Sequence, residues 1–266
     1  MTSASYSFFA LFLNHFNTFL LIMAILAVIV FVALNFIEAG YGITINKKWG
    51  ATIGNKTAWA CMEIPVFATM TLLWLISDRT FLPVPLTLFI LFQIHYARRA
   101  FVFPFRLKGK GRMPVLIMLM GIVFNICNAL MQGGWIFFLS PADMYQPSWF
   151  LTPQFIVGTL VYLFGMGVNI QSDNIIRNLR KPGDSGHYLP SKGLFKYVTG
   201  AHYFGEIVEW IGFAILTWSL SGAVFALWTF ANLAPRANAV YHKYQHIFGA
   251  ETLQKRHLKR VFPFIY

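Results

Sequence analysis

Long apolar segments that recur along the chain are the feature that most constrains its fold. Seven can be marked, with the polar residues gathered between them, at about 16–37, 58–76, 81–104, 114–139, 150–171, 205–219 and 221–235. A helix needs about twenty residues to cross the roughly 30 Å of hydrocarbon in a bilayer, and the longer segments have that length. The chain is 57% hydrophobic and only 11% charged, outside the range of soluble domains. We therefore predict an all-α polytopic membrane protein, a seven-transmembrane-helix bundle forming a single domain over 1–266.

The first and last segments need separate treatment. No basic residue precedes the first segment and its apolar run is too long for a cleaved signal, so we expect it to remain as a membrane helix. The last two segments are short and meet near Leu220, Ser221 and Gly222. They form either a tight helical hairpin or one long bent helix.

The Lys and Arg residues are concentrated in every second loop of this scheme, so nearly all of them lie on one side of the membrane. Cytoplasmic loops of membrane proteins carry an excess of positive residues, most clearly in short loops. Of the 21 Lys and Arg, Arg79 alone lies on the side that otherwise has none, while the others lie within 47–56, 98–112, 177–196 and 236–260. The alternation requires an odd number of spans. It predicts an N-terminus that is outside or lumenal and a C-terminus in the cytoplasm.

Several other classes of function find little support. The net charge of +12 comes from short loops between apolar segments, so we expect no nucleic-acid partner. Cys61 and Cys127 lie inside apolar segments and show no metal or redox spacing. His242 and His246 are four residues apart, but no third ligand is in sight, so we expect no metal. A Gly-rich dinucleotide fingerprint and a P-loop are both missing from the sequence, so a nucleotide site would be made from the helices.

Polar residues of the apolar segments gather in the half of the bundle assigned to the cytoplasm. Glu63 lies within its segment, where a charge costs several kcal/mol, and Tyr96 comes just before a pair of arginines. Asn169 and Asp173 are four residues apart at the end of the fifth segment, so they can share one helix face. Glu206 and Glu209, three apart, open the sixth segment in the same way. A cavity lined by these groups would open to the cytosol.

A basic, glycine-containing loop is expected between the fifth and sixth segments. Cations neutralise phosphate and glycine lets backbone amides approach it, so this loop suits a phosphate-bearing ligand. Its polar residues are Arg177, Arg180, Lys181, His187, Tyr188 and Lys192. Simpler explanations stay open: Glu63 can pair with a cation for structure, Tyr96 can be an interfacial anchor, and the cations can be ordinary positive-inside residues.

The sequence resembles the steroid 5-alpha-reductase family, the membrane 3-oxo-5-alpha-steroid 4-dehydrogenases. The strongest similarity runs from Gly165 to Ala214 within a core match over 165–266, with Gly165-Met166-Gly167, Ser172-Asp173, Leu179-Arg180-Lys181-Pro182-Gly183 and Gly205-Glu206-Ile207. Weaker similarity covers Glu63-Ile64-Pro65, His95-Tyr96, Phe101-Val102-Phe103-Pro104 and the ending Pro263-Phe264-Ile265-Tyr266.

The resemblance implies a reductase that uses NADPH to saturate the C4–C5 double bond of 3-oxo-4-ene steroids, with hydride added to C5. By similarity, Tyr96 would bond the 3-oxo oxygen with Glu63 positioning or activating it, and Trp59 and Trp210 would line the steroid slot beside them. The implied cofactor-binding residues are Arg112, Asn169, Asp173, Arg180, Tyr188, His202, Glu206, Arg236 and Tyr244. His202 departs from the family, which usually has Asn at this position.

Other functions remain open at this stage. An enoyl thioester or a polyprenol would suit an apolar, aromatic slot as well as a steroid does. A membrane methyltransferase would have a similar helix count but would bind S-adenosylmethionine, and a transporter would extend its polar groups into the outer half. We expect a monomer with its active site accessible from the cytoplasm, in a bacterial inner membrane or the endoplasmic reticulum.

Overall fold

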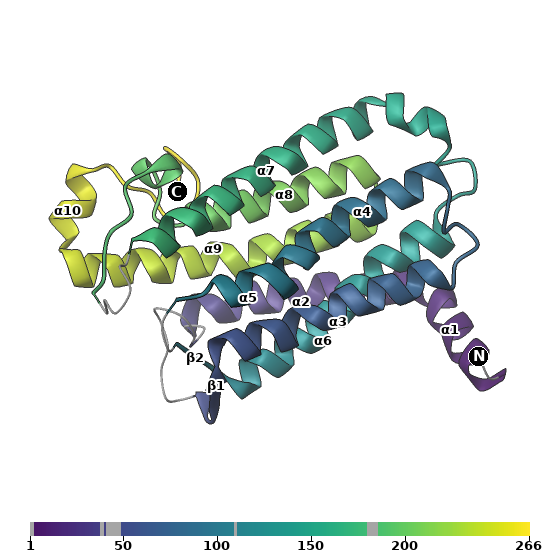
Figure 1. Cartoon of the computed structure of the whole chain (residues 1–266), viewed down its shortest axis with the longest axis horizontal. Helices are drawn as coiled ribbons and strands as arrows, with labels where there is room; N and C mark the ends of the chain where they lie inside the picture. Colours follow the sequence, from purple (N-terminus) through teal and green to yellow (C-terminus); the bar gives the residue numbers. More distant parts are fainter. Residues whose placement is uncertain (1–2, 38–39, 41–48, 109–110, 180–185) are drawn as a thin grey trace.

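The computed structural model describes residues 3–37, 40, 49–108, 111–179 and 186–266, and these are mostly helical. Long helices run side by side along the longest axis, and Figure 1 shows α10 at one end of the bundle and α1 at the other. In chain order the elements are α1 Ser3–Asn14, α2 Phe16–Phe36, β1 Thr52–Gly54, α3 Asn55–Leu75, α4 Pro83–Ala97, η3 Arg98–Val102, α5 Phe103–Arg106, β2 Arg112–Pro114, α6 Val115–Gly134, η4 Trp135–Leu139, η5 Pro147–Leu151, α7 Pro153–Asn178, η6 Gly193–Lys196, α8 Ala201–Thr217, α9 Leu220–Phe248 and α10 Ala250–Lys255.

Among the described residues, five helical stretches are long and apolar enough to cross a membrane. They are α2, α3, the run Pro83–Arg106, the run Val115–Leu139 and α7. Large apolar side chains point outward along them, and Leu21, Ile25, Val123 and Leu160 are each more than half exposed. Such a surface is unfavourable in water but matches hydrocarbon. The protein is therefore an all-α, multi-pass membrane protein, as the recurring apolar segments predict.

The final two apolar segments form a helical hairpin. α8 ends at Thr217, Trp218 takes a left-handed conformation with φ 46°, and α9 begins at Leu220. The Ser219 side chain caps α9 by accepting a hydrogen bond from the Gly222 amide at 3.0 Å. A left-handed residue ends one helix while a serine cap starts the next, so the chain reverses within a few residues. The bent-helix alternative is wrong.

Two helices run further toward the α10 end than the apolar pattern predicts. α7 continues to Asn178, so Arg177 is helical and does not belong to the expected loop. α9 continues through Pro235 to Phe248, more than three turns past the predicted end. The α7 extension was assigned to a loop and the α9 extension to the tail, because hydropathy marks hydrocarbon and not the end of helical structure.

Four glycines bring α7 and α8 into backbone contact. A Cβ added at Gly165 would lie 2.2 Å from the Glu209 amide nitrogen, and one at Gly212 would lie 2.2 Å from that of Tyr162. Gly158 and Gly205 face backbone atoms of the opposite helix in the same way. Each pair is seven residues apart, which places its two glycines on one helix face. These four residues, termed here the glycine seam, allow the close approach typical of membrane helices.

Candidate active site

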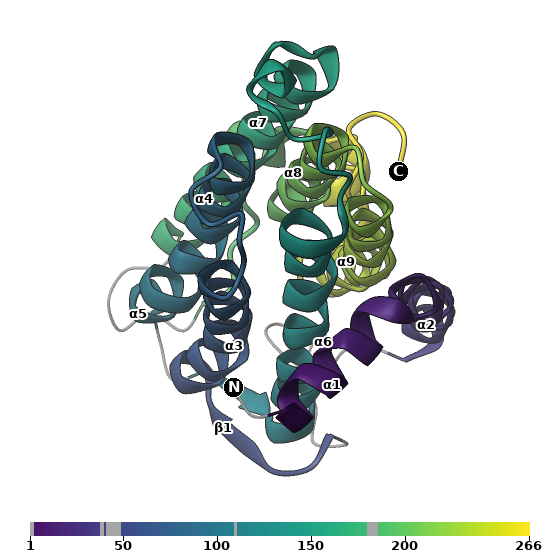
Figure 2. The ribbon, with the colours of Figure 1, turned by 90° about the vertical axis from the view of Figure 1, so that its right-hand side faces the viewer.

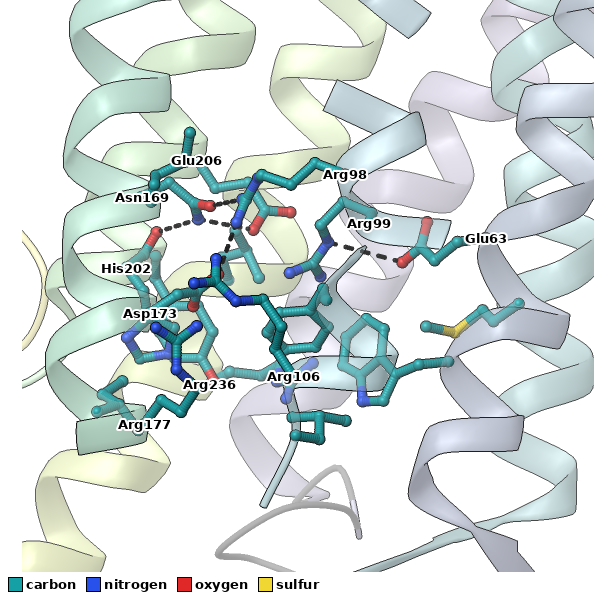
Figure 3. A pocket seen from close by; sticks show the side chains of 18 of the residues that line it. Glu63, Arg98, Arg99, Arg106, Asn169, Asp173, Arg177, His202, Glu206 and Arg236 are labelled. Carbon is teal, nitrogen blue, oxygen red and sulfur yellow. Dashed lines mark hydrogen bonds and ion pairs between the residues drawn. The ribbon is translucent and has the colours of Figure 1, made fainter. Parts of the chain in front are cut away.

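A cavity of about 670 Å³ opens at the α10 end of the bundle, between α3, α4 with η3, α6, α7, α8 and α9. Figure 3 shows the polar side chains that line it. The described lining residues include three carboxylates, of Glu63, Asp173 and Glu206, and six Lys or Arg side chains. Figure 2, seen from the opposite α1 end, shows how these helices are arranged in cross-section, with α2 beside α9 at the edge of the bundle. The cavity therefore combines an apolar helical frame with an excess of positive charge.

Arg98 joins the α4 side of the cavity to α7. Its guanidinium donates to Asp173 Oδ2 at 3.1 Å and also to the Asn169 side-chain oxygen. The Asn169 amide in turn donates to the His202 carbonyl oxygen at 3.0 Å and lies 3.4 Å from a Glu206 oxygen (Figure 3). Asn169 and Asp173 share one face of α7, as their spacing predicts, and both bind Arg98. The network fixes three helices around one polar corner.

Glu63 faces the same cavity from α3. Its Oε2 accepts a hydrogen bond of 3.2 Å from the Asn125 amide, which also donates to the Met62 carbonyl at 2.7 Å. Arg99 approaches Oε1 at 3.9 Å while its guanidinium lies 4.6 Å from the centre of the Trp59 ring. The carboxyl group is thus positioned by an amide on α6 and a cation on η3.

Tyr96 lies on α4, buried to 3% exposure, with its phenol at the cavity. Its hydroxyl oxygen accepts a 2.8 Å hydrogen bond from the Asn128 amide of α6. The Trp210 ring lies behind it, with centroids 5.7 Å apart, and His95 stacks edge-on against Trp210 at 4.8 Å. Packed aromatic rings on one side and a hydrogen bond on the other fix the phenol in one position.

The π-helical turn η3 explains how consecutive arginines reach different helices. Arg98 bonds to α7 and Arg99 approaches α3, immediately after the α-helical turn that holds Tyr96. A π turn widens the helix by one residue and changes the direction of the side chains that follow, and such turns are frequent at functional sites. It sets both cations at the cavity within one turn of the phenol.

The two glutamates of α8 separate, although their spacing permits a shared face. Glu206 lines the cavity, whereas Glu209 is fully buried and binds His95, with Oε1 2.7 Å from Nδ1. The pair joins α8 to α4 in the interior. Glu209 therefore holds the two walls together and Glu206 faces the ligand space.

Comparison with known proteins now adds to this geometry. A sequence profile described as 3-oxo-5-alpha-steroid 4-dehydrogenase matches residues 111–266. The 3-oxo-5-alpha-steroid 4-dehydrogenase 1 of Bos taurus is 36% identical over 225 residues, which are 83% of this chain and 86% of that protein. The steroid 5-alpha-reductase of Gossypium hirsutum is 35% identical over 94% of this chain and 97% of its own length, and that of Arabidopsis thaliana 35% over 88% and 90%.

The chain belongs to the 3-oxo-5-alpha-steroid 4-dehydrogenase family. The predicted family resemblance is confirmed, and the protein is an oxidoreductase. The matched region begins at 111, well before the predicted core match at 165, and therefore includes α6.

The family's need for a nicotinamide cofactor can be tested against the residues of the cavity. Arg98 Nε and His202 Nδ1 are both buried, and in the described structure each lacks a hydrogen-bond partner. Buried polar atoms seldom stay unpaired, so both point to a ligand with acceptor and donor groups. The cations that line the cavity, Arg98, Arg99, Arg106, Lys108, Arg177 and Arg236, suit phosphates. The residues fit an anionic nucleotide.

Most of the predicted site residues come together in this cavity. The lining includes Trp59, Glu63, Tyr96, Asn169, Asp173, Tyr188, His202, Glu206, Trp210, Arg236 and Tyr244. Arg112 does not: it lies on β2, and its guanidinium donates to the Thr52 hydroxyl and carbonyl oxygens at 2.7 and 2.5 Å. Arg180, Lys181, Pro182 and Gly183 lie outside the described residues.

Three contributors were missed by sequence reasoning. Arg98 was counted only as a loop cation, although the chain places it one turn from a buried tyrosine. Asn125 and Asn128 were overlooked because the amides of the 114–139 segment were not considered, although Asn169 of the 150–171 segment was. Amides inside a membrane helix are also costly and usually functional, so their three-residue spacing in 114–139 was an available signal.

Proposed function

We propose that this protein reduces the C4–C5 double bond of 3-oxo-4-ene steroids with NADPH, with hydride added to C5. The observation that carries the proposal is the Tyr96 phenol at the cavity, fixed by Asn128 and Trp210 in a chain of this family. Aromatic and aliphatic side chains also line this cavity, including Phe124, Phe225 and Trp228. Such a wall accommodates a rigid apolar ring system, and the phenol offers it one polar anchor.

Tyr96 acts by stabilising charge on the steroid. Hydride addition to an enone builds negative charge on the carbonyl oxygen, and a preorganised donor aimed at that oxygen commonly lowers the barrier by about 3 kcal/mol. The Tyr96 hydroxyl is this donor. Glu63, with Arg99 beside it, lies on the facing helix and sets the charge balance around the same group.

The basic corner of the cavity holds the cofactor. NADPH, when bound there, supplies the hydride. Arg98 and Arg236 neutralise phosphate charge together with Arg180, while Asn169, Asp173, Glu206 and His202 bind the polar groups of the nucleotide. Tyr188 and Tyr244 line the same cavity and add to the cofactor site, and Trp59, also in the lining, contributes to the steroid slot. Two ligands of opposite character thus occupy one cavity.

The α10 end faces the cytoplasm in this proposal. The excess of Lys and Arg lies there, and the hairpin of α8 and α9 adds two spans to the five apolar stretches. Seven spans then place the N-terminus outside and let NADPH enter the cavity from the cytosol. A monomer suffices, because every group assigned a role comes from one chain.

An assay with purified protein tests the proposal. The protein in detergent or nanodiscs is mixed with NADPH and testosterone or progesterone, and NADPH oxidation is followed together with the mass and stereochemistry of the product. We expect stoichiometric formation of the 5α-reduced steroid. If NADPH were oxidised only in the presence of an enoyl thioester or a polyprenol, that compound would replace the steroid as the proposed substrate. Binding of S-adenosylmethionine without NADPH oxidation would exclude a reductase.

A further inference from the structure

We propose that Asn128 is a positioning residue that makes the Tyr96 hydroxyl a hydrogen-bond donor toward the cavity. This inference rests on the proposed function, because it concerns the group assigned to the 3-oxo oxygen. Asn128 is fully buried on α6, whereas the described residues that line the cavity include Tyr96 and Asn125 but not Asn128. It therefore acts on the steroid only through the phenol.

The contact between the two side chains fixes the direction of the phenol's hydrogen. A tyrosine hydroxyl has one hydrogen to donate and lone pairs with which to accept. Its oxygen accepts from Asn128 Nδ2 at 2.8 Å, so the hydrogen is directed to another acceptor. In the described structure no hydrogen bond donated by Tyr96 to a protein group is present, and Glu63 is bonded to Asn125. A carbonyl oxygen in the cavity supplies the missing acceptor.

The orientation of the Asn128 amide follows from its surroundings. The side-chain oxygen of Asn128 is buried and has no partner in the described structure. If the amide were reversed, its two N–H groups would occupy that position without an acceptor. Unpaired buried donors are rarer than under-used carbonyl oxygens, which favours the amide that donates to Tyr96. The reversed amide would instead take the phenol's hydrogen and remove the donor from the cavity.

The same contact makes the phenol a stronger donor. A hydroxyl that accepts a hydrogen bond is polarised and donates more strongly, and the effect is larger in a low-dielectric interior. This part of α6 is dry, with Asn128, Met131 and Gln132 all within 1% of full burial. Asn128 thus both orients and strengthens the group that meets the substrate.

Gln132 is a matched control on the same helix. It is as buried as Asn128, but its amide donates 3.0 Å to the Ser221 carbonyl oxygen at the start of α9, away from the phenol. Replacing either amide by leucine removes one buried hydrogen bond, and leucine keeps the forked side chain of asparagine with the same number of heavy atoms. Both variants should lower the Tm to a similar degree, while only one should change the behaviour of Tyr96.

Kinetics in a double-mutant cycle test the inference. Asn128→Leu should lower kcat about tenfold with an unchanged KM for NADPH, and should cause no further loss in a Tyr96→Phe background. Gln132→Leu should have the same small effect on kcat with and without Tyr96→Phe. Equal losses from Asn128→Leu in both backgrounds would reduce Asn128 to a structural role. Asn128→Asp, whose carboxyl can take the phenol's hydrogen, serves as a second variant if leucine prevents folding.

A binding measurement gives a readout independent of turnover. A 3-oxo-4-ene steroid labelled with ¹³C at C3 should show a downfield carbonyl shift when bound to the wild type and to Gln132→Leu, and a smaller one with Asn128→Leu or Asn128→Asp. An unchanged shift in both Asn128 variants, with an active wild type, overturns this inference alone. A wild type that neither binds nor reduces the steroid overturns the proposed function and this inference with it.

Discussion

The cavity has one wall made of α7 and α8 and another made of α3, α4 and α6, and the helices within each wall are joined in a different way. On the wall of α7 and α8, the glycine seam brings backbone against backbone, so that an added methyl group meets main-chain atoms 2.2 to 2.5 Å away at all four positions. On the wall of α3, α4 and α6, the helices are joined through side chains. There a Cβ added at Gly121 would meet the flexible end of Met62, and buried amides join the helices.

Because of this difference, we expect the two walls to tolerate changes in packing to different degrees. Backbone contact cannot adjust, so the groups proposed for the cofactor keep fixed spacing across the seam. Side-chain contact can repack, and cores tolerate such changes when volume is conserved. The rigid wall suits a constant nucleotide, and the adjustable wall suits a steroid whose substituents vary.

The largest effect is expected from closing the seam. Gly165→Ala inserts a methyl group against the Glu209 backbone and should lower the free energy of unfolding by about 3 kcal/mol, with loss of NADPH binding. Gly167→Ala is the control, because no atom lies within 4 Å of its added Cβ and alanine favours a helix. Thermal melts with NADPH titrations compare them. Equal melts would mean that the seam is not the rigid element.

Removal of the Tyr96 hydroxyl, the proposed hydrogen-bond donor, should have the second largest effect. Tyr96→Phe should lower kcat at least tenfold, by about 1.4 kcal/mol or more, because the developing oxyanion loses its hydrogen bond. The variant should stay folded with a modestly lower Tm, since the ring and its contact with Trp210 remain but the Asn128 amide loses its acceptor. Steady-state kinetics give the value. Full activity in this variant would remove Tyr96 from the chemistry even if the reaction is correct.

Glu63→Gln tests the adjustable wall at its carboxyl group. The amide keeps the shape of Glu63 but removes its negative charge beside Arg99, and we expect turnover to fall about tenfold with little change in Tm. A variant that retains full turnover, with reduced stability only, would support the simpler view that Glu63 is a structural partner of Arg99.

The smallest effects concern two arginines outside the rigid wall: Arg98, which bonds across the cavity to that wall, and Arg112, which does not line the cavity. Arg98→Ala should raise KM for NADPH about tenfold and leave KM for the steroid nearly unchanged, because it removes a cation and its bonds to Asp173 and Asn169. Arg112→Ala, whose guanidinium is bonded to Thr52, should raise it by only about twofold. A larger change for the steroid than for NADPH would move Arg98 out of the cofactor site.

How much could be predicted depended on which physical signal a residue carries. Apolar length marked the helices, and intramembrane charge brought Glu63, Asp173 and Glu206 to one cavity. The direction of a side chain around its helix has no such signal, so Glu209 was grouped with Glu206 although it binds His95 inside the bundle. The π turn that aims Arg98 and Arg99 arises from local backbone packing, which spacing alone does not reveal.

The packing role of the glycine seam also could not be predicted from the sequence alone. Gly165 and Gly205 were recognised only as family residues, because a glycine in a membrane helix has several uses. Their role became clear when the opposing backbone was present. The amides of Asn125 and Asn128 could have been found, since an uncharged polar group in hydrocarbon is also costly.

Transfer of a labelled hydride tests the central claim most directly. Purified protein is given NADPH carrying deuterium at both C4 positions of the nicotinamide and a 3-oxo-4-ene steroid, and the product is examined by NMR. The account predicts one deuterium at C5 in the 5α configuration, at a rate lowered at least tenfold by Tyr96→Phe. A product without deuterium at C5, or no NADPH-dependent reduction of the steroid, would contradict it.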